Sequence, residues 1–235
     1  MDKFKLFCFP FAGGSSTSYN FLKKLLEPDI QVIPIELPGH GRRFNEPLLG
    51  SIDEMAEDAY HQLSEKLGDT PFAFFGHSMG TLIAYKVSQK LQRMAKPLPE
   101  MLFMSGRKPP FLPVDRVRYR LENEELLKEL LIMGGITQEF LDSEELMALF
   151  LPIIRTDLKA VETYDYTEEK TIFDFKIHVL NGIDDPFTDI NSMALWKLYS
   201  SKSCEVHNFS GGHFFIQEQP KNFKEFFNRL IFQQV

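Results

Sequence analysis

The sequence predicts an α/β fold in which a mostly parallel central sheet is flanked by helices. Six short runs are almost continuously apolar, which is typical of parallel strands covered on both faces. These runs are residues 4–9, 31–37, 71–75, 100–104, 175–180 and 203–209. The longer segments between them carry apolar residues at helical spacing, and this alternation indicates a doubly wound sheet.

Two helices have recognisable starts in the sequence. Ser51 followed by Glu54 predicts a capping box at the start of a helix over residues 51–67. Pro220 precedes the last segment with helical periodicity, and proline favours the first turn of a helix.

Length and composition indicate one domain spanning residues 1–235. Hydrophobic residues make up 43% and charged residues 25%, which is an ordinary globular composition. The net charge of −7 argues against binding nucleic acid by bulk attraction, and no apolar run approaches the roughly 20 residues of a membrane span. Cys8 and Cys204 are expected to be reduced thiols. We therefore expect a cytoplasmic monomer that binds neither nucleic acid nor membrane.

Residues from about 107 to 169 interrupt the alternation with helix and loop signals only. Residues 107–120 carry five basic side chains against Asp115, whereas residues 121–150 carry eight acidic side chains against Lys128. The acidic stretch also holds apolar residues at helical spacing. We expect a helical insertion placed as a lid over a site at the carboxyl ends of the strands. The alternative is a helical elaboration that only covers core.

A nucleophile elbow is the strongest chemical signal. Gly76-His77-Ser78-Met79-Gly80 fits Gly-x-Ser-x-Gly, with an apolar strand before it and a helix pattern after it. The tight turn exposes Ser78 in a strained conformation. It also brings positions 76 and 80 close together, so both must be glycine. It also directs the Met79 N–H towards a developing oxyanion.

An acid and a histidine follow in the order of an α/β-hydrolase. Asp184 and Asp185 come directly after the strand at 175–180. We favour Asp185, because Pro186 fixes the chain just after it, and keep Asp184 as the alternative. His213 follows the last strand behind two glycines, which gives the order Ser78, Asp185, His213.

A second oxyanion donor is expected from the glycine loop after the first strand. That loop, residues 10–15, can present the N–H of Ala12, with Phe11 as the alternative. It lacks the spacing of a phosphate-binding loop.

The remaining histidines are expected to have no part in the triad. We expect His77 to pack with its ring away from Ser78, His178 and His207 to be structural, and His61 to be solvated. His40 lies on a loop that borders the site. No spacing suggests a metal site, and no metal is expected.

Seven segments together resemble the stand-alone type II thioesterases of non-ribosomal peptide and polyketide synthesis, which belong to the α/β-hydrolase superfamily. They cover nearly the whole chain: Phe9–Gly14, Leu37–Arg43, Gly76–Gly80, Ser105–Pro110, Leu151–Asp157 with Tyr164, Gly182–Pro186 and Gly211–Phe215. Three of them look specific to this family, namely the opening glycine loop, the Leu37–Arg43 loop and the Leu151–Asp157 stretch.

The resemblance implies a serine thioesterase that removes stalled or wrong acyl groups from the phosphopantetheine arm of carrier proteins. Ser78 would be the nucleophile, His213 the base and Asp185 its orienting partner, with Met79 and Ala12 as oxyanion donors. The expected partners are acyl or peptidyl carrier proteins, and the substrate itself carries the phosphopantetheine, so the enzyme needs no cofactor. The basic stretch at 107–120, with Arg116, Arg118 and Arg120, is our candidate carrier contact; a solvated charged loop is the alternative.

Three other functions share parts of this pattern. A general carboxylesterase or lipase, or an acyltransferase, would use the same triad with a different lid and acceptor. A carrier-binding module without turnover would keep the fold alone, but it does not require a complete set of Ser, Asp and His.

Overall fold

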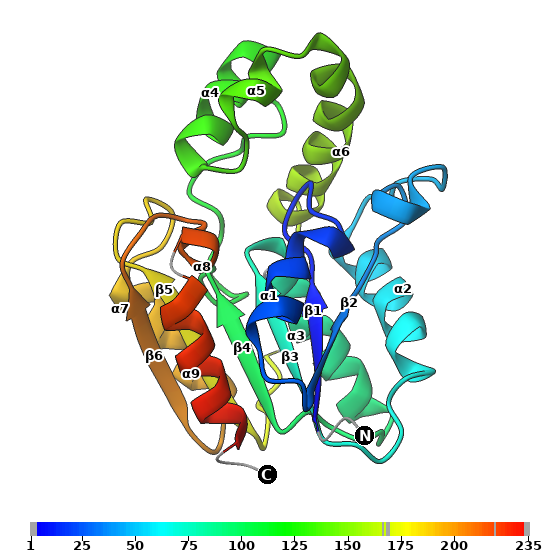
Figure 1. The fold of residues 1–235 in the computed structure, drawn as a ribbon, viewed down its shortest axis with the longest axis vertical. Helices are drawn as coiled ribbons and strands as arrows, with labels where there is room; N and C mark the ends of the chain where they lie inside the picture. The colour runs from blue at the N-terminus through cyan, green and yellow to red at the C-terminus, as the bar shows by residue number, and fades with distance from the viewer. Residues whose placement is uncertain (1–3, 166, 168–169, 219, 233–235) are drawn as a thin grey trace.

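One parallel sheet forms the centre of the molecule (Figure 1). The computed structural model describes residues 4–165, 167, 170–218 and 220–232. Six strands lie in the order β2-β1-β3-β4-β5-β6, and all neighbours pair in parallel. The strands are β1 (Phe4–Phe9), β2 (Ile30–Pro34), β3 (Phe72–His77), β4 (Met101–Ser105), β5 (Lys176–Gly182) and β6 (Cys204–Phe209). Each lies on one of the predicted apolar runs.

The second strand ends earlier than predicted. It pairs with β1 as far as Pro34, and Ile35 still donates its N–H to the carbonyl of Cys8. Glu36 then donates its N–H to the Gln62 side chain instead of to the sheet. The chain therefore leaves the ladder before residue 37, because its backbone partners are no longer on a strand.

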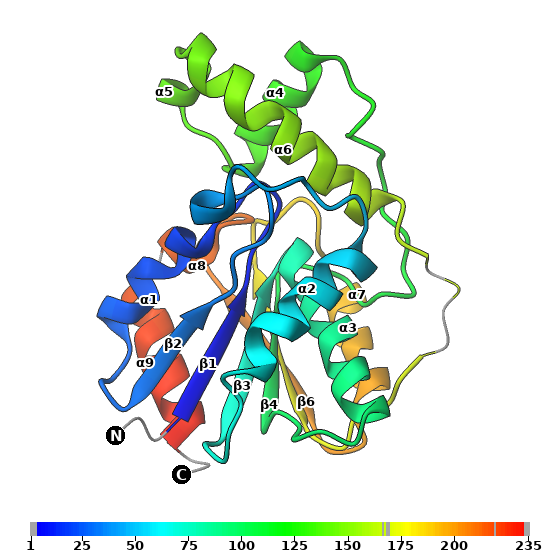
Figure 2. The ribbon, with the colours of Figure 1, turned by 90° about the vertical axis from the view of Figure 1, so that its right-hand side faces the viewer.

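Helices cover both faces of the sheet (Figure 2). On one face lie α1 (Asn20–Leu25) and α9 (Pro220–Phe232); on the other lie α2 (Ile52–Ser64), α3 (Met79–Arg93) and α7 (Ile190–Ala194). Separate clusters of buried apolar side chains fill the two interfaces. This burial on both sides explains why the strand sequences are apolar throughout.

Both predicted helix starts are found, one with a difference. Helix α9 begins at Pro220 as predicted. Ser51 caps α2 by accepting the N–H of Glu54. The Glu54 carboxylate, however, accepts from Gly50 rather than from Ser51, so the capping box is shifted by one residue at this helix.

The insertion between β4 and β5 is helical, as predicted. It contains α4 (Asn123–Met133), α5 (Gln138–Leu141) and α6 (Glu144–Glu162), which stand above the carboxyl ends of the strands (Figures 1 and 2). Within the described part of residues 107–169 there is no strand. A third apolar cluster lies among these helices.

Cys8 and Cys204 are both free thiols. Among the described residues, no helix has the length and apolar character needed to cross a membrane.

Candidate active site

Ser78 stands at a strained turn between β3 and α3. Its φ of 53° and ψ of −114° place a non-glycine residue at positive φ, a conformation that persists only where its surroundings enforce it. Its N–H donates to the carbonyl of Ser105 at 2.8 Å. A Cβ on Gly76 would overlap the backbone of Gly80, and one on Gly80 would overlap the backbone of Phe9. The close approach of three backbone segments therefore requires both glycines.

His213 and Asp185 meet beside this turn. The two atoms His213 Nδ1 and Asp185 Oδ2 are 2.8 Å apart, and both side chains are buried. Asp185 Oδ1 accepts the N–H of Phe187. Asp184 is exposed and contributes its backbone N–H to the carbonyl of Gly211. Of the two candidate aspartates, the structure brings Asp185 to the histidine.

The hydrogen bond to Asp185 determines the tautomer of His213. A carboxylate only accepts, so Nδ1 must carry the proton and Nε2 is left as an acceptor. His213 Nε2 is buried and has no hydrogen-bond partner among the described residues. Ser78 and His213 line the same two cavities. The basic nitrogen therefore belongs to the same enclosed space as the candidate nucleophile.

His77 packs against the ring of His213. Its ring centroid lies 4.9 Å from that of His213, and its Nδ1 is 2.9 Å from the Ser105 hydroxyl. Complete burial lowers the pKa of His77 well below its ordinary value, so this ring is neutral. The predicted packing role fits the structure. The contact with His213 was not predicted, because the two residues are far apart in sequence.

The two predicted oxyanion donors come from different segments. Met79 is the first residue of α3, where N–H groups have no partner within the helix. Ala12 lies on a tight turn in which Gly14 donates its N–H to Phe11. Ala12 and Phe11 both line a cavity together with Ser78 and His213. Both loop residues named from the sequence are therefore at the site.

Two cavities of different character open from Ser78 and His213. The first is apolar and lies between the glycine loop and the insertion, lined by Phe11, Ala12, Leu130, Met133, Ile136, Ile154, Leu158, Val161 and Phe214. The second is more polar, with Arg107, Lys108, Asp115, Arg118, Glu162 and Thr188 among its lining residues. Met133, Leu158 and Val161 of the insertion border both cavities. The insertion therefore supplies part of the wall of both cavities, and its role as a lid stays a prediction.

His40 is buried next to the site and bonds to a residue that the sequence analysis did not single out. His40 Nε2 and Asp157 Oδ2 are 2.9 Å apart. The same carboxylate oxygen accepts the N–H of Gly13 at 2.8 Å. The only sequence signal was that His40, Asp157 and Gly13 each lie in one of the three segments specific to the thioesterase resemblance.

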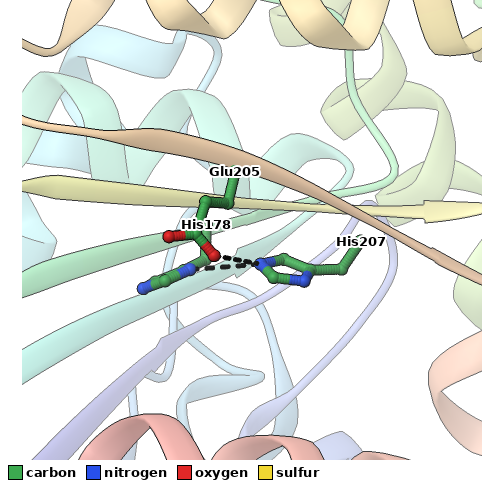
Figure 3. A group of neighbouring side chains, drawn as sticks. All are labelled: His178, Glu205 and His207. Atoms are coloured by element: carbon green, nitrogen blue, oxygen red, sulfur yellow. Dashed lines mark hydrogen bonds and ion pairs between the residues drawn. The ribbon is translucent and has the colours of Figure 1, made fainter.

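Among the described residues, a cluster of three side chains, His178, Glu205 and His207, could offer metal ligands (Figure 3). His178 Nδ1 lies 3.2 Å from His207 Nε2, which is 3.8 Å from a carboxylate oxygen of Glu205. Burial lowers the pKa of His178 to about 4. Two neutral rings at this distance form an N–H···N hydrogen bond, which accounts for the contact without an ion. The sequence analysis did not anticipate this cluster, because strand pairing brings it together.

The fold and the site define an α/β-hydrolase with a Ser, His and Asp at the carboxyl ends of its strands. The family model described as "Thioesterase domain" matches residues 4–231, and the chain belongs to this family. Thioesterase PikA5 of Streptomyces venezuelae is 33% identical to this chain, and the match covers 92% of this chain and 76% of PikA5. The medium-chain S-acyl fatty acid synthase thioesterase of Homo sapiens is 31% identical over 97% of this chain and 86% of its own.

Solved structures agree with this family. The type II thioesterase BorB from the borrelidin biosynthetic cluster superposes with a TM-score of 0.86 at 31% identity. The match covers 96% of this chain and 91% of that one.

Proposed function

We propose that this protein hydrolyses acyl groups from the phosphopantetheine arm of carrier proteins, and so restores carriers that hold a stalled or wrong acyl group. The observation that carries this proposal is the Asp185–His213 hydrogen bond beside Ser78, where an apolar and a polar cavity meet. The related BorB is a type II thioesterase from the borrelidin biosynthetic cluster. Membership of the thioesterase family favours this activity over the carboxylesterase and acyltransferase alternatives.

Acylation of Ser78 is the first half of the proposed reaction. Ser78 Oγ attacks the thioester carbonyl carbon while His213 Nε2 takes the hydroxyl proton. The negative charge moves to the carbonyl oxygen, where the N–H groups of Met79 and Ala12 stabilise it. The C–S bond then breaks, and the pantetheine sulfur leaves as a thiol after His213 returns the proton.

Hydrolysis of the acyl-enzyme is the second half. His213 Nε2 removes a proton from water, whose oxygen attacks the ester carbonyl carbon. The tetrahedral intermediate collapses, Ser78 Oγ regains its proton from His213, and the free acid leaves. Asp185 remains a carboxylate throughout, orienting His213 and stabilising the imidazolium. Because neutral His77 packs against His213, it adds no positive charge that would oppose imidazolium formation.

The two cavities suggest where the two parts of the substrate bind. The apolar cavity under the insertion suits the acyl chain, because its burial there removes apolar surface from water. The polar cavity suits the pantetheine arm, whose amides and phosphate can use Arg107, Lys108 and Arg118.

Ion pairs engage three of the basic side chains in the proposed carrier contact at residues 107–120. Arg116 pairs with Glu125 and Glu129 of α4 at 2.6 and 2.7 Å, and Arg118 also pairs with Glu129. Lys108 pairs with Asp115. These ion pairs offset the charges of Lys108, Arg116 and Arg118, whereas Arg120 is exposed and its guanidinium donates to the Tyr119 hydroxyl. The carrier contact stays a prediction.

The direct test compares three substrates that carry the same short acyl group: a phosphopantetheinylated carrier, free pantetheine thioester and a p-nitrophenyl ester. We expect the highest kcat/KM with the carrier and loss of turnover in Ser78→Ala. Equal kcat/KM for the oxygen ester and the carrier would instead support a general esterase. We expect the enzyme to act as a cytoplasmic monomer without a metal.

A further inference from the structure

We propose that Asp157 of α6 is a positioning residue for the oxyanion hole, which couples the lid helix to the reacting centre. This inference rests on the proposed function, because it assigns to Asp157 the task of orienting the loop that carries the Ala12 N–H. Asp157 is completely buried, and one of its oxygens accepts hydrogen bonds from Gly13 and His40. It thereby joins α6 to the loops that follow β1 and β2.

The bond to Gly13 orients the turn that holds Ala12. The Gly13 N–H belongs to the peptide plane that begins at Ala12, so its bond to Asp157 fixes that plane. The bond from the Gly14 N–H to the Phe11 carbonyl closes the same turn. With both bonds formed, the direction of the Ala12 N–H is determined.

Packing against α6 holds the turn from a second side. Gly13 has a φ of +74°, and a Cβ there would lie 2.6 Å from Cγ1 of Ile154. Ile154 and Asp157 are three residues apart on α6 and therefore lie on the same face of the helix. The helix contacts the loop with one apolar and one charged side chain, and Ile154 also lines the apolar cavity.

His40 supplies the counter-charge for the buried carboxylate. Its Nδ1 is 2.9 Å from the Pro38 carbonyl and its Nε2 is 2.9 Å from Asp157 Oδ2. Both neighbours are acceptors, so both ring nitrogens must carry protons and His40 is an imidazolium. Glu36, whose carboxylate accepts from Ser16 just after the glycine loop, adds a second negative charge near this ring.

A purely structural role does not call for these residue types. Burying an ion pair costs desolvation free energy, and an apolar side chain of similar volume often serves stability equally well. Asp157 Oδ1 is also buried with no hydrogen-bond partner among the described residues, which adds to that cost. What the carboxylate provides, and an apolar residue cannot, is an acceptor for the Gly13 N–H.

The test uses two substitutions of Asp157 and one control in the same helix. Asp157→Leu removes the acceptor, whereas Asp157→Asn retains an oxygen that can accept from Gly13. Arg155→Ala is the control, because the Arg155 guanidinium donates to the carbonyls of Tyr119 and Leu121 and to the Asn123 side chain, which belong to the insertion and not to the glycine loop. Each variant is measured for kcat and KM on an acyl-pantetheine thioester, for the rate of Ser78 labelling by a fluorophosphonate, and for thermal unfolding.

We expect Asp157→Leu to lower kcat and the labelling rate together by at least about tenfold, since both reactions need the oxyanion hole. KM should change less than kcat, Asp157→Asn should recover a large part of both rates, and Arg155→Ala should stay within about threefold of the parent kcat. Wild-type kcat and labelling in a folded Asp157→Leu protein would overturn the inference. If that variant does not fold, labelling of Asp157→Asn no faster than about a hundredth of the parent rate would overturn the acceptor role. Retained turnover in Ser78→Ala would instead overturn the proposed function.

Discussion

At the scale of single residues, the choice between Asp184 and Asp185 has a clear functional consequence. Asp185 holds the Nδ1 proton of His213, so Asp185→Asn should favour the wrong tautomer. We expect kcat to fall by about 10³–10⁴-fold with little loss of stability, as in other triads of this kind. Steady-state kinetics on an acyl-pantetheine thioester measure the change in kcat.

Asp184→Asn is the matched control for that substitution. Asp184 is exposed, whereas the carboxylate hydrogen-bonded to His213 is that of Asp185. The kcat of Asp184→Asn should match the parent within about twofold. A larger loss of kcat in Asp184→Asn than in Asp185→Asn would contradict the assignment of the acid.

The buried pair of His40 and Asp157 predicts a pH-dependent stability. The neighbouring carboxylates of Asp157 and Glu36, together with the Pro38 carbonyl, raise the pKa of His40 above its ordinary 6.5, against the opposing effect of burial. The folded state therefore binds this proton more tightly than the unfolded state. The stabilisation is complete below about pH 6.5 and is lost as pH rises through the raised pKa.

Denaturant unfolding of His40→Gln at several pH values measures this effect. The loss in unfolding free energy relative to the parent should be larger at pH 6 than at pH 9. A loss that is equal at both pH values would show that the charge of His40 does not contribute to stability.

At the scale of elements, the contact between the glycine loop and α6 can be separated from ordinary glycine strain. Gly13→Ala places a Cβ against Ile154 and also forces alanine to positive φ. Gly68→Ala is the control. Gly68 has a similar φ of +57°, but a Cβ there would meet only the flexible end of Lys5, at 3.8 Å. Urea unfolding should show a loss of about 1 kcal/mol for Gly68→Ala and a clearly larger one for Gly13→Ala.

The double variant Gly13→Ala/Ile154→Ala provides the check, because Ile154→Ala removes the Cγ1 atom that the new Cβ would overlap. Its loss of unfolding free energy should be smaller than the sum of the two single losses, because the two positions are in contact. Strict additivity of the two single losses would show that the loop does not pack on α6 as described.

The strands and the elbow were predictable because their signals are local. An apolar run or a Gly-x-Ser-x-Gly turn is recognised from a few consecutive residues, and His213 and Asp185 each follow a strand at a defined place. The pairing of His40 with Asp157 depends on residues 117 positions apart in the chain. The neutralisation of Arg116 and Arg118 by α4 likewise depends on how the insertion folds back. Local charge counts could not show it.

The early end of β2 has the same explanation. Ile35 and Leu37 have the apolar character of a strand. The N–H of Glu36 between them, however, donates to the Gln62 side chain of α2 and not to a neighbouring strand. A residue from another element decides that boundary, and no pattern within the strand itself records it.

At the scale of the whole molecule, the insertion and the glycine loop after β1 together enclose the cavity proposed for the acyl chain. Met133 of α4 borders both cavities. Met133→Trp should fill space needed by longer chains and lower the ratio of kcat/KM for octanoyl over acetyl thioesters by about tenfold. The neighbouring Ile132 is 72% exposed and lines neither cavity. Ile132→Trp should leave that ratio unchanged, and an equal change in both variants would contradict the placement of the acyl chain.

In the proposed activity, a serine nucleophile at the elbow removes acyl groups from a carrier-bound thiol. The most direct measurement is mass spectrometry of an acetylated, phosphopantetheinylated carrier protein incubated with the enzyme and, separately, with Ser78→Ala. We expect loss of the acetyl group with the parent enzyme, leaving the free phosphopantetheine thiol, and no loss above the spontaneous rate with Ser78→Ala. Deacylation by Ser78→Ala at the parent rate, or an acetylated carrier that persists with the parent enzyme, would contradict the proposed activity.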